Sequence, residues 1–256
     1  MSGLKAWLAD KLPPWLFLVA VLAIWQWVVA QGWVASYLLA SPWQVFVTTV
    51  NLWPEIWAAT VSTAGSIVWG LSLSVLIGVS MALVFFTIPF LRRAVLPFCI
   101  FFQTVPIIAI APLLVIWFGF GDPTVRASAF IVSLFPILAN TLTGLQETDR
   151  ELQELFNLYK PSRWQLITKL QIPGSLPYML TGIRIATGLA VIGAITGEFM
   201  AGGGLGALID SARTQQRVDL VFSGVLMSSI LALALVMVIQ LVSRLLLGRR
   251  PYLRSV

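Results

Sequence analysis

The side chains that most often catalyse reactions or bind metals are scarce in this sequence. Histidine is absent and cysteine occurs once, at Cys99. These counts exclude an internal disulfide, His/Cys metal sites and catalytic arrangements that depend on histidine, such as Ser-His-Asp. The sequence also has no G-x-x-x-x-G-K-[ST] segment, so it lacks the loop with which P-loop proteins hold ATP phosphates. We therefore expect no catalytic residue, no metal and no cofactor bound by this chain.

Two glycine-containing segments could be given a chemical interpretation. Gly119-Phe120-Gly121-Asp122 matches the G-x-G-D pattern of intramembrane aspartyl proteases, whose chemistry requires two carboxylates that share a proton. No partner Asp or Glu lies in the interior of an apolar stretch, so the segment is better explained as a turn. The glycines of Gly202–Gly206 resemble a phosphate loop only superficially. They follow an apolar helix, which favours a tight re-entry turn.

The elements that must position any functional residue are long apolar helices. Hydrophobic residues make up 59% of the chain and charged residues 10%, against about 45–50% and about 25% in soluble domains. Because charges are costly in the bilayer, the uncharged intervals mark the spans, and each can hold the roughly 20 residues that a spanning helix needs. The sequence therefore predicts an all-α, polytopic membrane protein with about six transmembrane helices. The predicted spans are 15–33, 60–87, 93–118, 125–145, 175–198 and 220–247.

The distribution of Lys and Arg predicts the orientation. If the spans alternate, most basic residues lie on one side of the membrane, and the opposite loops carry only Arg126, Arg213 and Arg217. The positive-inside rule then places both termini in the cytoplasm, and the net charge of +6 needs no nucleic-acid partner. The apolar run from Trp15 could alternatively be a secretory signal, but its length, its Trp content and the even number of spans favour a retained helix.

The segment Glu147–Pro173 contains eight charged residues in a chain that otherwise has few. Leu152, Leu155 and Phe156 recur at helical spacing before Pro161, which predicts a short amphipathic helix followed by a second piece that leads into the fifth span. This helix could anchor the loop at the membrane surface. Alternatively, it could be a docking helix for a cytoplasmic partner.

A family resemblance rests on this segment and on the span that follows. The order Glu154, Lys160, Leu170, Ile172 and Pro173 resembles the EAA loop of ABC importer permeases. Further motifs resemble the nitrate/sulfonate/taurine branch of that family: Ser162-Arg163-Trp164-Gln165, Leu176-Pro177-Tyr178, Thr181-Gly182-Ile183-Arg184-Ile185-Ala186, and Glu198 followed by Gly204-Leu205-Gly206. The chain departs from the family at Leu155 and Phe156, where Ala is usual, and at Lys160, where Gly is usual.

The resemblance implies a single permease domain over 1–256 with the type I importer fold, a core at 60–247 and an extra N-terminal helix at 15–33. It implies a transport subunit in the bacterial cytoplasmic (inner) membrane that is not itself an enzyme. Its expected partners are cytoplasmic ABC ATPase subunits that bind ATP and Mg, a periplasmic or lipid-anchored solute-binding protein, and a second copy of itself. The solute would be a sulfonate-, taurine- or nitrate-like oxyanion, or a pyrimidine or vitamin precursor. The alternative is an ion-coupled secondary transporter or channel.

Two groups of residues are candidates for function. The resemblance assigns contact with the ATPase to the charged loop, at Glu151, Glu154, Leu155, Phe156, Tyr159, Lys160, Ser162 and Arg163. Polar side chains and breaks in the spans suggest a translocation pathway, with the candidates Gln103, Thr104, Pro106, Arg184 and Glu198. For the last two a structural role competes: Arg184 could reach the interface or pair with Glu147, Asp149 or Glu154, and Glu198 could be an interfacial residue rather than a gate.

Overall fold

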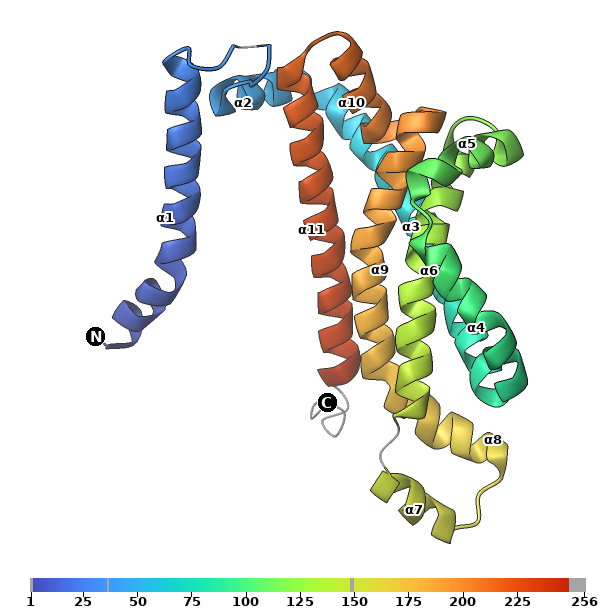
Figure 1. The fold of residues 1–256 in the computed structure, drawn as a ribbon. Helices are drawn as coiled ribbons and strands as arrows, with labels where there is room; N and C mark the ends of the chain where they lie inside the picture. Colours follow the sequence, from blue (N-terminus) through green and yellow to red (C-terminus); the bar gives the residue numbers. More distant parts are fainter. Residues whose placement is uncertain (1, 36, 148–149, 249–256) are drawn as a thin grey trace.

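The computed structural model describes residues 2–35, 37–147 and 150–248, and every regular element in these ranges is helical (Figure 1). Five helices are long and apolar enough to cross a membrane, and the bent pair α4–α5 makes a sixth if it is one span, which confirms the prediction of an all-α polytopic membrane protein. In chain order the elements are α1 (Ser2–Ala30), α2 (Pro42–Asn51), α3 (Trp53–Thr87), α4 (Pro89–Thr104), α5 (Ile107–Phe118), α6 (Asp122–Gln146), α7 (Arg150–Leu158), α8 (Arg163–Leu166), the π-helical η1 (Ile167–Gln171), α9 (Ile172–Ala201), α10 (Gly204–Thr214) and α11 (Val218–Gly248).

The segment expected to form one helix at 93–118 is two helices that meet at an angle of 102°, so the prediction of a single helix is wrong. The break falls at Val105 and Pro106, where Val105 adopts an extended conformation with ψ 122°. Proline has no N–H to donate and disfavours the helical conformation in the residue before it, which accounts for the position of the bend.

The short helix α2 has no counterpart among the predicted spans. Its start is fixed by a capping box in which Ser41 Oγ accepts from the Gln44 N–H at 3.2 Å and Gln44 Oε1 accepts from the Ser41 N–H at 2.9 Å. Pro42 occupies the first turn, where a missing N–H has no consequence. The Ser-Pro-x-Gln order of residues 41–44 was therefore the local signal for this helix.

The core is the packed set of α3, α6 and α9, whose backbones approach closely where small residues meet. At Gly70 of α3 an added Cβ would lie 2.8 Å from Ala129 Cβ and 2.9 Å from the Arg126 carbonyl oxygen of α6. At Gly193 of α9 it would lie 2.7 Å from the Ser128 carbonyl oxygen. Since apolar side chains gain little by leaving lipid for protein, such close backbone contact is a main source of association between spanning helices.

The ends of the bundle differ. The end that carries α7 and α8 is called the α7 end below, and the opposite end, which carries α2 and α10, is called the α10 end (Figure 1). Helix α1 stands apart from the core along most of its length and meets the rest of the chain near the α10 end, where the Trp25 and Phe222 rings are 5.3 Å apart. The start of α4 lies at the α7 end, and its Leu91 and Val95 pack on a second apolar cluster around Phe85, Leu142 and Leu145.

Candidate functional site

Helix α7 lies outside the bundle and presents apolar side chains to solvent. Leu155 is 55% exposed and Tyr159, in the turn that follows, is 81% exposed. Glu151 and Glu154 are exposed on the same short helix, whereas Phe156 is half-buried. The predicted amphipathic helix is present, and Leu155 on its apolar side is exposed.

The turn after α7 has an unusual backbone conformation at Lys160. Lys160 has a φ of +49°, a left-handed conformation that L-residues seldom adopt and that glycine adopts easily. The chain is held there by a hydrogen bond from the Lys160 N–H to the Asn157 carbonyl oxygen at 2.9 Å. This backbone geometry would suit Gly, the residue that the resemblance leads one to expect here, although the chain carries Lys.

A second capping box starts the return to the membrane. Ser162 Oγ accepts from the Gln165 N–H at 3.2 Å, and Gln165 Oε1 accepts from the Ser162 N–H at 2.9 Å. Arg163 begins α8 and is exposed. Helix α8 continues into η1, where the Ile172 N–H bonds to the Ile167 carbonyl oxygen, and then into α9. Gln171 of η1 is buried, and its Oε1 has no partner within the described residues. Such π-helical turns often mark functional positions in helices.

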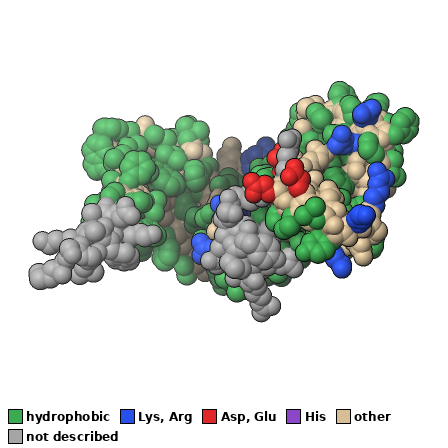
Figure 2. Space-filling model, turned by 90° about the horizontal axis from the view of Figure 1, so that it is seen from below, with side chains coloured by type: hydrophobic (Ala, Val, Ile, Leu, Met, Phe, Trp, Pro, Cys, Tyr) green, Lys and Arg blue, Asp and Glu red, His purple; other side chains and the backbone are tan. Residues whose placement is uncertain are grey.

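Charge is distributed unequally between the two ends. At the α10 end Arg126, Arg213 and Arg217 each pair with an aspartate, at 2.7, 2.7 and 3.2 Å. At the α7 end Arg92 and Arg93 form no ion pair within the part of the chain that the structure describes. Figure 2 views the α7 end, where basic side chains gather on one side of the face and acidic side chains lie beside them. The uncompensated positive charge is therefore at the α7 end.

Three of the predicted pathway residues lie together at the bend between α4 and α5. Gln103 and Thr104 are exposed, and the Thr104 hydroxyl donates to the Phe101 carbonyl oxygen at 2.7 Å. Pro106 is also exposed and begins the turn into α5. Interrupted backbone at membrane depth is tolerated where it faces protein or water, so this bend is suited to line a cavity.

The other two pathway candidates are far apart on α9. With the side-chain amide of Gln240 turned so that its oxygen faces the guanidinium, Arg184 Nη2 and Nε donate to it at 3.0 and 3.2 Å. The partner of Arg184 is therefore on α11 rather than in the charged loop, although Asp149 lies outside the described residues. Glu198 follows fourteen residues later, about 21 Å further along the helix.

Glu198 is 2% exposed and joins three helices at the α10 end. One carboxyl oxygen accepts from the Thr63 hydroxyl of α3 at 2.7 Å, and the other accepts from the Gly206 N–H of α10 at 2.7 Å. The Leu205 N–H in turn donates to Thr63 Oγ1 at 2.9 Å. A Cβ at position 204 would collide with the Glu198 carboxyl group, so the glycines provide space as well as a turn.

The cluster around Glu198 could not be recognised from spacing alone, because Thr63 is 135 positions away in the sequence. The sequence signal for it was the combination of one carboxyl residue with Gly204 and Gly206 a turn later. In the structure the Glu198 carboxyl group connects α9 to α3 and α10.

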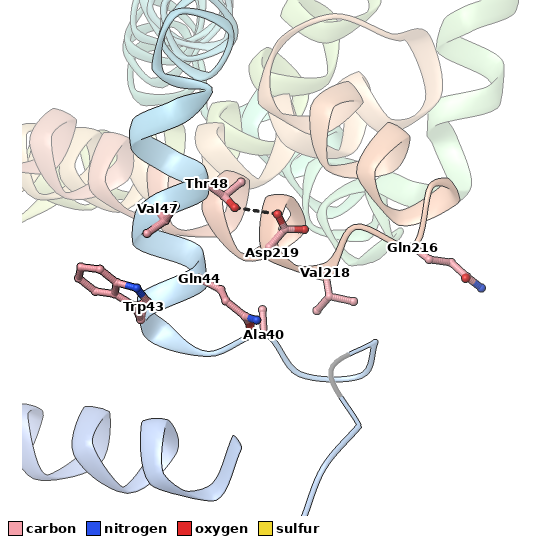
Figure 3. Close-up of a pocket in the computed structure, with 8 residues that line it drawn as sticks. All are labelled: Ala40, Trp43, Gln44, Val47, Thr48, Gln216, Val218 and Asp219. Atoms are coloured by element: carbon pink, nitrogen blue, oxygen red, sulfur yellow. Dashed lines mark hydrogen bonds between the residues drawn. The ribbon is translucent and has the colours of Figure 1, made fainter. Parts of the chain in front are cut away.

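A pocket of about 350 Å³ opens at the α10 end between α2 and the segment that joins α10 to α11 (Figure 3). The Thr48 hydroxyl donates to Asp219 Oδ2 at 2.7 Å, and Arg217 pairs with the same oxygen. The Asp219 carboxylate, which lines the pocket, therefore already has two partners and is not free to bind a cationic ligand. Within the described residues no group of three His, Cys, Asp or Glu side chains could hold a metal ion.

These features define the class of protein as a polytopic membrane protein with a short exposed helix at one end. The chain belongs to the family of binding-protein-dependent transport system inner membrane components, whose model matches residues 74–250. The match begins within α3 and includes all of the elements described from α4 onwards. It confirms the resemblance to ABC importer permeases and identifies a transport permease rather than a known class of enzyme.

Three relatives show the range of the family. The chain is 36% identical over 226 residues to the formylaminopyrimidine transport permease protein ThiX of Halalkalibacterium halodurans, which covers 88% of this chain and 90% of the relative. It is 32% identical over 248 residues to the riboflavin transport system permease protein RibX of Chloroflexus aurantiacus, with 94% and 90% covered. It is 28% identical over 256 residues to the putative aliphatic sulfonates transport permease protein SsuC of Escherichia coli, with 98% and 96% covered.

Proposed function

We propose that this permease works as an ATP-driven importer subunit and that α7 binds a separate ATPase subunit. The observation that carries the proposal is the exposed apolar face of α7, which includes Leu155 and Tyr159 and adjoins two carboxylates. Apolar side chains in a polar rim are typical of binding surfaces, with the apolar residues supplying affinity and the charges fixing the register. The partner would bind ATP and Mg, for which this sequence has no phosphate loop.

The orientation follows from the same proposal. The α7 end faces the cytoplasm, and with it both termini, because ATP is available there and because unpaired Arg side chains favour that side. The paired Arg residues of the α10 end then face the exterior, where a solute-binding protein would deliver its ligand. A second copy of the chain would complete the pathway, as the family resemblance implies.

The proposed solute is a small heteroaromatic compound of the pyrimidine or vitamin-precursor type. Support comes from the relatives named for formylaminopyrimidine and riboflavin, which are 36% and 32% identical to this chain, against 28% for the sulfonate permease. Calorimetry on the purified cognate binding protein would compare a formylaminopyrimidine, riboflavin and taurine. Tight binding of taurine alone would overturn this choice of solute and leave the ATPase proposal intact.

A charge reversal tests the ATPase contact. The change Glu154→Lys puts a positive charge on the docking face, and we expect at least about tenfold weaker co-purification of the ATPase and loss of coupled ATP hydrolysis. The matched control is Glu55→Lys, the same change at an exposed residue of the α10 end. Unchanged coupling in the Glu154 variant would refute the role of α7.

A second measurement separates this function from ion-coupled transport. Uptake into cells or vesicles should stop when ATP is depleted and should persist when the proton gradient is dissipated with ATP present. The reverse dependence would favour the ion-coupled alternative.

A further inference from the structure

An apolar groove lies between α3 and α4 at the α7 end. Its volume is about 390 Å³, and its walls include Leu76, Met81 and Val84 of α3 and Leu91 and Val95 of α4. Ser80 is the one polar side chain of the lining, and its hydroxyl donates to the Leu76 carbonyl oxygen of its own helix at 2.7 Å. The groove is therefore suited to an apolar occupant.

One arginine lies at the edge of this groove. Successive residues of a helix are about 100° apart, so Leu91 and Val95 share the groove face of α4, Arg92 flanks that face, and Arg93 lies on the opposite side. Arg92 is half-buried and Arg93 is exposed. Neither forms an ion pair with any described residue, so the charge of Arg92 is available to a ligand in the groove.

We propose that this groove binds an anionic phospholipid of the bilayer, with an acyl chain against α3 and α4 and the headgroup phosphate at Arg92. The groove supplies apolar walls, and Arg92 supplies a cation beside them. A long Arg side chain can keep its stem along apolar surface while its guanidinium meets a phosphate at the interface. Basic residues next to gaps between spanning helices are a known means of holding anionic headgroups.

The charge pattern favours a lipid over a second copy of the chain. A parallel second copy would need a carboxylate at the depth of Arg92. Among α3, α4, α5, α6, α9 and α11, however, the carboxylates lie at or near the α10 end: Glu55, Asp122, Glu198 and Asp219. An anionic lipid in the leaflet at the α7 end brings the complementary charge to the required depth. The proposal does not depend on the solute or on the ATPase.

Native mass spectrometry of the full-length chain in detergent tests the proposal. Phosphatidylglycerol and phosphatidylcholine with the same acyl chains are titrated separately. We expect one phosphatidylglycerol per chain to bind more tightly than phosphatidylcholine, and Arg92→Gln to weaken it about fivefold. The matched control Arg93→Gln removes the same charge one residue away on the opposite face, and it should have a much smaller effect.

The groove itself is tested with Ser80→Trp, which fills it and should reduce phosphatidylglycerol binding without changing the oligomeric state. If Ser80→Trp instead dissociates the oligomer and leaves lipid binding unchanged, the groove is assigned to a second copy of the chain. Photoactivatable phosphatidylglycerol, added to the unaltered chain, gives a readout that needs no variant. Cross-links within 76–95 support the proposal. Equal binding of the two lipids, equal effects of the two Arg variants, or cross-links only elsewhere would overturn it.

Discussion

Replacing Glu198 tests how the α10 end is held together. The Glu198→Ala change removes both hydrogen bonds of the carboxyl group, to the Thr63 hydroxyl and to the Gly206 N–H, each 2.7 Å long. The Thr63 hydroxyl keeps a second acceptor, the Ala59 carbonyl oxygen at 3.1 Å. The Gly206 N–H loses its acceptor in a buried site, and it is the main source of the expected destabilisation.

The magnitude can be estimated from these contacts. A buried N–H without a partner costs about 1–3 kcal/mol, and the one lost methylene group contributes about 0.8 kcal/mol. The free energy of unfolding should therefore fall by about 2–4 kcal/mol. In a chain of this size, that corresponds to a melting temperature lower by about 4–16 °C.

Thermal unfolding of the purified chain in detergent, with transport measured in parallel, provides the assay. Glu198→Gln keeps the volume and one acceptor, so we expect an intermediate shift. Thr63→Val removes the hydroxyl that the Leu205 N–H uses, and its effect should be less than additive with Glu198→Gln because the two side chains share a bond. Glu55→Gln is the exposed control and should not shift the melting temperature. A Glu198→Ala variant with the same melting temperature as the unaltered chain would refute the cohesive role of Glu198.

Three further predictions concern single positions. Gly70→Ala should lower the melting temperature by several degrees, because its Cβ meets α6 at 2.8 Å, whereas Gly65→Ala meets nothing within 4 Å and should have no effect; equal shifts would contradict the packing argument. Lys160→Gly should stabilise the turn by about 1 kcal/mol, since it relieves a left-handed Lys, and a lower melting temperature would count against that geometry. Gln240→Leu should leave the Arg184 guanidinium without its acceptor and lower both stability and uptake; normal values for both would show that the pair is dispensable.

The spans could be predicted because charge is costly in a bilayer and therefore marks their boundaries. The same argument does not detect where a span bends. Pro106 was recognised as a break in hydrogen bonding, but the 102° change of direction depends on how α5 packs against α6 and α9. The helix α2 was missed for a different reason: it is short, and its signal lies in the capping residues Ser41 and Gln44 rather than in hydropathy.

Some features of the candidate site could likewise be predicted from the sequence, and others could not. The exposed face of α7 could be predicted, since three residues at helical spacing define it locally. The partners of Arg184 and Glu198 could not, because Gln240 and Thr63 lie on other helices and no periodicity connects them. Arg184 illustrates the difference: nearby carboxylates were the obvious candidates, and the structure gives it a neutral amide.

The two ends are mechanically connected by one nearly continuous helix. From Arg163 through η1 to Ala201 it has 39 residues, about 58 Å at 1.5 Å per residue, and Glu198 ties its far end to α10 and α3. If α7 binds an ATPase as proposed, a nucleotide-driven shift at α8 should therefore move α10. Spin labels at Thr214 of α10 and Val61 of α3, in a chain in which Cys99 is replaced by Ser, would measure the distance between α10 and α3 with and without ATP. We expect the distance to change in the unaltered complex and to become insensitive to ATP after Glu198→Ala. A response that persists in the variant would show that the coupling runs through another contact.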